Sequence, residues 1–136
     1  MRIVSILSSP HSIARFGVTA FFAVVFLQSG IDKVLDRAGN LSWLTGHFKD
    51  SALAEMVPTL LTVLTALELA AGIFCGLGVL FTDFSREGWC TAAIGLMFAT
   101  AALLSLLIGQ RLAKDYAGAA VVAAYFAVAL IGLALF

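Results

Sequence analysis

Four long apolar runs divide this 136-residue sequence, and polar connections of unequal length separate them. Each run is close to the roughly 20 residues that a helix needs to cross a bilayer core at about 1.5 Å per residue. Apolar residues are continuous within each run and do not alternate with polar ones, which favours helices over membrane strands. We therefore predict four membrane-spanning helices, over residues 13–34, 56–81, 89–108 and 116–136.

Two of the three connections, residues 82–88 and 110–115, are short, so the helices that they join are expected to pair as antiparallel hairpins. The first connection has about twenty residues, well above the roughly two to eight usual between helices of a bundle. In it Leu41, Trp43, Leu44 and Phe48 alternate with polar residues. This pattern predicts a short amphipathic segment at the membrane interface, anchored by Trp43.

Small residues recur at helical spacing in the last three apolar runs. Gly72 and Gly76 are four apart in the second run, as are Gly95 and Ala99 in the third. Small residues let helix backbones approach closely in lipid, where no hydrophobic force drives helices together. The fourth run is rich in them, and we expect the last two helices to be buried along these faces: Gly118, Ala119, Ala120, Ala123, Ala124 and Ala127. The expected fold is a single all-α domain over residues 1–136, an integral membrane four-helix bundle with a long interfacial loop between helices one and two.

Composition supports a membrane protein, because 62% of the residues are hydrophobic and only 12% are charged. A soluble domain has roughly 45–50% and about 25%, respectively. The formal net charge is zero, which argues against a nucleic-acid partner and leaves the lipid bilayer as the expected one. His11 and His47 should fall on opposite membrane sides, so they cannot clamp a haem together, and we expect no intrinsic metal site.

The best candidate site is a ring of polar residues at one end of the bundle. Antiparallel threading brings the end of the first helix to the same membrane side as the third connection, under the long loop that carries His47. Gln28 and Asp32 are four apart and so share a helical face. The ring either binds a ligand or only closes the bundle, for example through an Asp32–Arg111 ion pair. Its expected members at this end are Gln28, Asp32, Lys33, Gln110, Arg111, Lys114, Asp115 and Tyr116.

Glu68 lies deeper than this ring, near the middle of the second apolar run. A carboxylate at that depth must face the bundle interior, be protonated or find a cation. Gly72, one turn further on the same face, leaves room for a neighbouring helix or a ligand head group. Intramembrane carboxylates usually serve a function, so we include Glu68 among the candidate site residues, with a purely structural hydrogen bond as the alternative.

Four short motifs make the chain resemble the DoxX family of small four-helix membrane proteins. They are Arg15-Phe16-Gly17, Gly30-xx-Lys33, the segment from Glu68 to Gly76, and the segment from Gly109 to Gly118. The resemblance covers essentially the whole chain and implies a membrane subunit associated with redox chemistry. Founding members of that family are linked to thiosulfate:quinone oxidoreduction in sulfur-oxidising archaea, and other relatives accompany oxidative-stress proteins in bacterial membranes. The implied location is a bacterial or archaeal cytoplasmic membrane.

Our leading hypothesis is an accessory subunit of a quinone-linked membrane redox complex. Arg15, the polar ring and Glu68 would bind a quinone head group or move protons, with Tyr116 or His47 bonding a quinone oxygen. Whether the chain itself is an enzyme stays open. One alternative is a structural helper that packs on other membrane subunits or on a second copy. The other is a small-solute transporter in which Glu68 is the coupling carboxylate.

Overall fold

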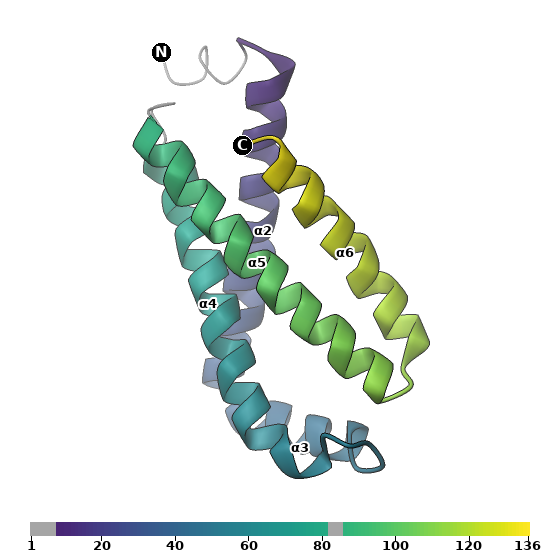
Figure 1. Cartoon of the computed structure of the whole chain (residues 1–136). Helices are drawn as coiled ribbons and strands as arrows, with labels where there is room; N and C mark the ends of the chain where they lie inside the picture. The colour runs from purple at the N-terminus through teal and green to yellow at the C-terminus, as the bar shows by residue number, and fades with distance from the viewer. Residues whose placement is uncertain (1–7, 82–85) are drawn as a thin grey trace.

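The structure is a computed structural model that describes residues 8–81 and 86–136 (Figure 1). Within these residues every regular element is a helix, which confirms the all-α prediction. Four of the helices are long and apolar enough to cross a membrane, as expected of a multi-pass integral membrane protein. The elements are α2 (Pro10–Leu35), α3 (Arg37–His47), the short 3-10 helix η1 (Ala54–Met56), α4 (Val57–Phe81), α5 (Arg86–Leu112) and α6 (Tyr116–Ala134).

The third membrane helix is longer than the apolar run predicted, because α5 continues past residue 108 to Leu112. It ends in a Schellman turn, in which the Asp115 backbone N–H donates to the Gln110 carbonyl at 2.9 Å. Lys114 occupies the left-handed position of this turn, with φ of 58°. The connection to α6 is therefore only residues 113–115, and Gln110 and Arg111 belong to the helix. Residues 82–85 of the other expected turn lie outside the described residues.

Glycines bring the helix backbones close together at the expected places. A Cβ atom on Gly72 of α4 would lie 2.7 Å from the backbone nitrogen of Leu27 on α2. One on Gly95 of α5 would lie 2.6 Å from the backbone nitrogen of Cys75 on α4. No real side chain fits at such distances, so both glycines are required for the contacts that hold α2, α4 and α5 together. This confirms the packing role predicted for these two positions.

The burial predicted for the small residues of α6 was correct at Ala119 and wrong at four of the alanines. Its alanines at positions 120, 123, 124 and 127 are exposed, and the buried residues of the helix are Ala119, Ala129 and Gly132. The helix packs chiefly on α5 and makes a lesser contact with α2 (Figure 1). Lipid solvates alanine as well as protein does, so composition alone does not decide which face of a membrane helix is covered.

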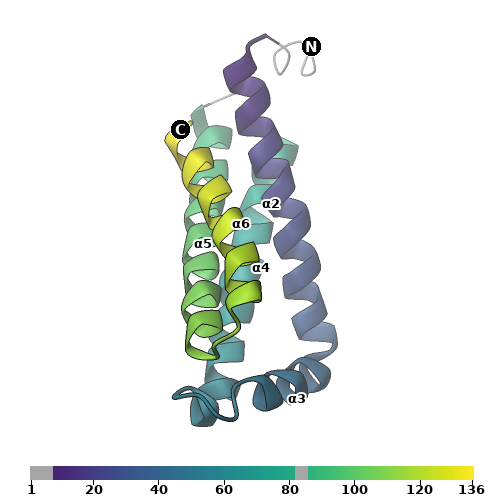
Figure 2. The same ribbon diagram turned by 90° about the vertical axis from the view of Figure 1, so that its right-hand side faces the viewer.

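The long first connection contains the predicted amphipathic segment, which is the helix α3. It runs across one end of the bundle, from the end of α2 toward the start of α4 (Figure 2). Asp36 joins it to α2: its backbone N–H closes the last turn of α2, and its side chain accepts a bond from the Gly39 N–H. Arg37 then donates to Thr62 and to the Pro58 carbonyl on α4. These bonds hold α3 as a cap on this end.

Candidate functional site

Glu68 forms a buried ion pair with Lys33. The ammonium nitrogen lies 3.0 Å from Glu68 Oε2, and the side chains are 14% and 1% exposed, respectively. Ser29 completes a triangle, since it donates to the same carboxylate oxygen at 2.8 Å and accepts from Lys33 at 2.7 Å. The sequence-based expectation that Glu68 faces the interior or finds a cation is confirmed on both counts. The triangle joins the middle of α4 to the end of α2.

Two close contacts between α2 and α4 hold this triangle in place. Gly72, one turn after Glu68, packs on Leu27, and Gly30, one residue after Ser29, packs on Leu69. A Cβ on Gly30 would come within 3.2 Å of the Leu69 backbone nitrogen. The helices are thus tightly apposed at both glycines, and Ser29 and Lys33, which are four apart, present one face to Glu68.

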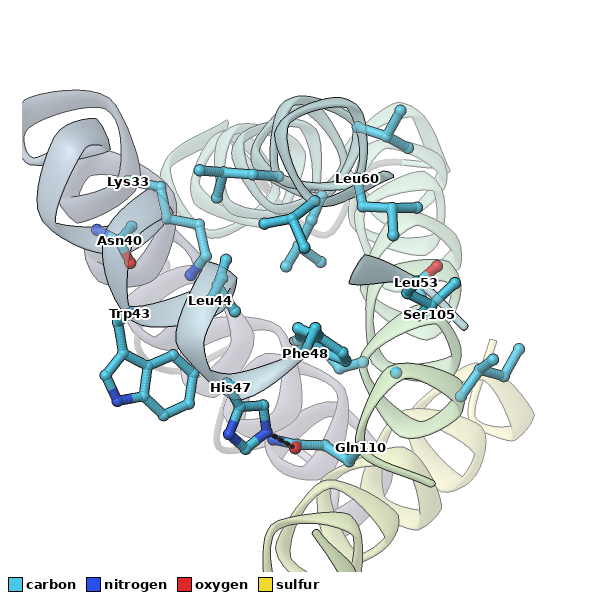
Figure 3. A pocket seen from close by; sticks show the side chains of 17 residues that line it. Lys33, Asn40, Trp43, Leu44, His47, Phe48, Leu53, Leu60, Ser105 and Gln110 are labelled. Carbon is cyan, nitrogen blue, oxygen red and sulfur yellow. Dashed lines mark hydrogen bonds between the residues drawn. The ribbon is translucent and has the colours of Figure 1, made fainter. Parts of the chain in front are cut away.

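A cavity of about 390 Å³ lies between the ends of α2, α4 and α5, under α3 (Figure 3). Lys33 and Asn40 border it on one side, and His47 and Gln110 on another. Its remaining wall is mostly apolar. The leucines that line it are Leu44, Leu53, Leu60, Leu61, Leu64 and Leu106. Its size and lining, mainly apolar with a few polar groups, are those of a small-molecule site.

His47 lies at the wall where α3 meets α5. Its Nε2 is 3.1 Å from Gln110 Oε1 and 3.6 Å from Asp115 Oδ2. The Trp43 ring stacks on its imidazole with ring centres 4.5 Å apart. These contacts tie the last turn of α3 to the α5–α6 turn. The long loop therefore covers this end of the bundle through His47, as the sequence predicted.

The predicted ring does not form one constellation. Gln28 and Asp32 are exposed, and Asp32 accepts a bond from Asn40 at 3.2 Å. Arg111 stacks on Tyr116, with its guanidinium carbon 4.6 Å from the ring centre. Among the described residues Asp32 and Arg111 do not form the expected ion pair. Their separation follows from α2, because the α2 face turned to α4 is the one with Ser29 and Lys33.

Of the ring residues predicted from sequence, Lys33 and Gln110 line the cavity, and Asp115 contacts His47 at its edge. The site predicted from the sequence did not include Ser29 or Asn40. A signal for Ser29 was present in the buried stripe of α2, which runs through Phe22, Phe26 and Gly30. Extending that stripe by helical spacing reaches Ser29 and Lys33 and passes over Gln28. Asn40 gives no comparable signal in the sequence.

Arg15 is near the start of α2 and Lys33 near its end. The two ends of α2 lie at opposite ends of the bundle (Figure 1). Its Nε donates to the Leu135 carbonyl at 2.6 Å. Its guanidinium carbon lies 5.1 Å from the ring centres of both Trp89 and Phe136. The structure thus separates Arg15 from the other candidate site residues and places it in an aromatic clamp that joins the ends of α2, α5 and α6.

The cavity presents hydrogen-bonding groups at an apolar surface. Lys33 has three N–H donors, and two of them serve Ser29 and Glu68. The third has no partner among the described residues, and the side chain borders the cavity. Glu68 balances the charge of the ammonium group. Within residues 8–81 and 86–136, no group of three or more His, Cys, Asp or Glu side chains could hold a metal ion. This arrangement suits an apolar ligand with an acceptor oxygen.

Comparison with protein-family models finds no match for this chain, and comparisons with curated proteins and with solved structures find none either.

Proposed function

We propose that this protein is a DoxX-like accessory subunit of a quinone-linked membrane redox complex and that its cavity holds the quinone head group. The observation that carries the proposal is the apolar cavity under α3 with the Lys33 ammonium group at its border. Quinone head groups are flat, uncharged and apolar except for their ring oxygens. A cavity of about 390 Å³ lies within the roughly 300–1,000 Å³ of small-molecule sites.

The polar groups around the cavity give each quinone oxygen a partner. The unused N–H of Lys33 would donate to one oxygen, and the His47–Gln110 pair would serve the other. Glu68 would hold the ammonium group in place and is close enough to share a proton with it. Partner subunits or a second copy of the chain would supply the electron path. The DoxX resemblance supports the redox setting and a bacterial or archaeal cytoplasmic membrane.

The test is quinone content after purification in mild detergent. Wild-type protein should yield quinone on solvent extraction, whereas Leu60→Trp, which fills the cavity from α4, should yield little. Leu80→Trp is the matched control, because Leu80 is also on α4, is 64% exposed and does not line the cavity. Glu68→Ala should lose quinone as well. Equal quinone in wild type, Leu60→Trp and Leu80→Trp would refute the proposal.

The exposed face of α6 supports a second function, that of a structural helper. Its small residues Ala120, Ala124 and Ala127 would allow a helix of another subunit to pack closely. Ala124→Leu should then abolish assembly with the partner while leaving the quinone content unchanged. Gly72→Leu is unsuitable for this test, because Gly72 is needed for the contact between α2 and α4 within the chain.

A further inference from the structure

The charges at the cavity are arranged in an unusual way. Lys33 is the lining residue that carries a full charge when His47 is neutral, within the described part of the chain. Glu68 does not line the cavity and is 1% exposed, yet its carboxylate lies 3.0 Å from the ammonium group. A ligand in the cavity therefore contacts an N–H donor of Lys33, whose positive charge is balanced by the Glu68 carboxylate outside the cavity.

The burial of the Lys33–Glu68 pair makes its charge balance important for which ligands can bind. Charges in a partly buried site interact far more strongly than charges in water, because little solvent screens them. An anionic ligand would be attracted by Lys33 and repelled by Glu68, whose carboxylate lies 3.0 Å from that ammonium group, and it would lose its hydration on leaving water. An uncharged ligand with an acceptor oxygen loses little hydration and still gains the hydrogen bond. The Lys33–Glu68 pair therefore favours uncharged ligands with an acceptor oxygen over anionic ones.

We infer that Glu68 sets the charge selectivity of the cavity, so that the site accepts uncharged amphiphiles with an acceptor oxygen and rejects anionic ones such as fatty carboxylates. Glu68 acts through Lys33 and is a specificity-determining residue that does not itself touch the ligand. The inference rests on the proposed function only in using the same cavity. Quinones belong to the accepted class, and long-chain alcohols belong to it as well.

The charge variants make opposite predictions. Glu68→Gln keeps the shape of the side chain and leaves Lys33 without its counter-charge, so the site should become one for anionic amphiphiles. Lys33→Gln leaves the Glu68 carboxylate alone, so the site should favour cationic amphiphiles. Replacing both residues by glutamine removes both charges and should restore the preference for uncharged ones. A single variant that folds poorly does not prevent the test, because the other one predicts the opposite change.

The experiment measures equilibrium binding of three radiolabelled probes to protein in phosphatidylcholine nanodiscs, after subtraction of binding to empty discs. The probes are 1-decanol, 1-decanesulfonate and decyltrimethylammonium. They have equal chain lengths and are uncharged, permanently anionic and permanently cationic, respectively. Leu60→Trp shows how much binding occurs outside the cavity. Retained decanol binding in a variant shows that its cavity is intact.

Wild type should prefer decanol to both ions. In Glu68→Gln the affinity for decanesulfonate relative to decanol should rise by about tenfold or more, which corresponds to a small part of one buried charge interaction. Lys33→Gln should show the same rise for decyltrimethylammonium. Unchanged preferences in either variant with an intact cavity would overturn the inference, even if quinone is recovered from wild type. Reversed preferences without any recovered quinone would keep the inference and reject only the proposed function.

Discussion

Two basic residues of α2, Arg15 and Lys33, lie near opposite ends of the bundle in contrasting surroundings. Arg15 fits between two aromatic rings and donates to a helix-end carbonyl, in a clamp that three helix ends share. Lys33 pairs with a buried carboxylate at the border of a cavity. The difference shows how a cation stabilises a helical membrane protein. At one end the Arg15 guanidinium group is packed tightly between side chains. At the other end the Lys33 ammonium group borders a cavity.

The largest effect is expected at the Lys33 end. Glu68→Leu leaves the Lys33 ammonium group buried without its counter-charge and should lower the free energy of unfolding by about 3–5 kcal/mol. The double variant Glu68→Leu with Lys33→Met removes both charges and should regain most of that loss. Unfolding in mixed detergent micelles with increasing SDS, followed by circular dichroism, measures both. Equal losses in the single and double variants would show that the pair is not the source of the effect.

The close contact between α2 and α4 should give the next largest effect. Gly72→Ala places a methyl group against the Leu27 backbone and should destabilise the protein by about 1–3 kcal/mol. Gly17→Ala is the control nearer the Arg15 end, where an added Cβ meets nothing within 4 Å. That change should be neutral or stabilising by up to about 1 kcal/mol, because alanine favours the helix. Similar unfolding curves for both variants would contradict the described packing.

At the other end, Arg15→Lys should destabilise by about 1–2 kcal/mol, although the charge is kept. The planar guanidinium group contacts two rings and a carbonyl at once, and a lysine ammonium group cannot match this geometry. Ligand content should stay at the wild-type level, because Arg15 is remote from the cavity. Solvent extraction and SDS titration of the same preparation measure the two properties. A loss of ligand in this variant would show that the two ends are coupled.

The smallest effect is expected in the turn between α5 and α6, at the end of the bundle that holds the cavity. Lys114 has a positive φ, which disfavours a residue with a Cβ atom, and glycine has no such penalty. Lys114→Gly should therefore stabilise the protein by about 0.5–1 kcal/mol. Ala113→Gly, in the same turn without a positive φ, should not. The unfolding midpoints of the two variants provide the comparison.

The hydrophobic pattern predicts the helices well, because membrane spans are long and their composition is distinctive. It also predicts that the long loop covers one end of the bundle and that Glu68 faces the interior, is protonated or finds a cation. It does not identify the partner, because a helix end carries polar residues on several faces and only packing selects one. Gln28 and Asp32 are as polar as Ser29 and Lys33. Only an extension of the buried stripe from Phe22 to Gly30 distinguishes the two pairs.

The sequence did not predict which face of α6 is buried. Alanine-rich helices suit both tight packing and lipid contact, so their sequence does not show which face is covered. The Arg15 clamp could not be foreseen either, since it depends on Trp89 and Phe136, which are distant in the sequence. Similarly, the cavity arises from the relative positions of four helices and has no local signature.

The most direct test of the central claim is a double-mutant cycle on Lys33 and Glu68, with the free energy of unfolding as the readout. The variants are Lys33→Met, Glu68→Leu and their combination. We predict a coupling energy of about 2–3 kcal/mol, at the upper end of values for residues in one ion-pair network. The same cycle on Asp32 and Arg111 should give a value near zero. A coupling near zero for Lys33 and Glu68 would contradict the buried pair and the site built on it.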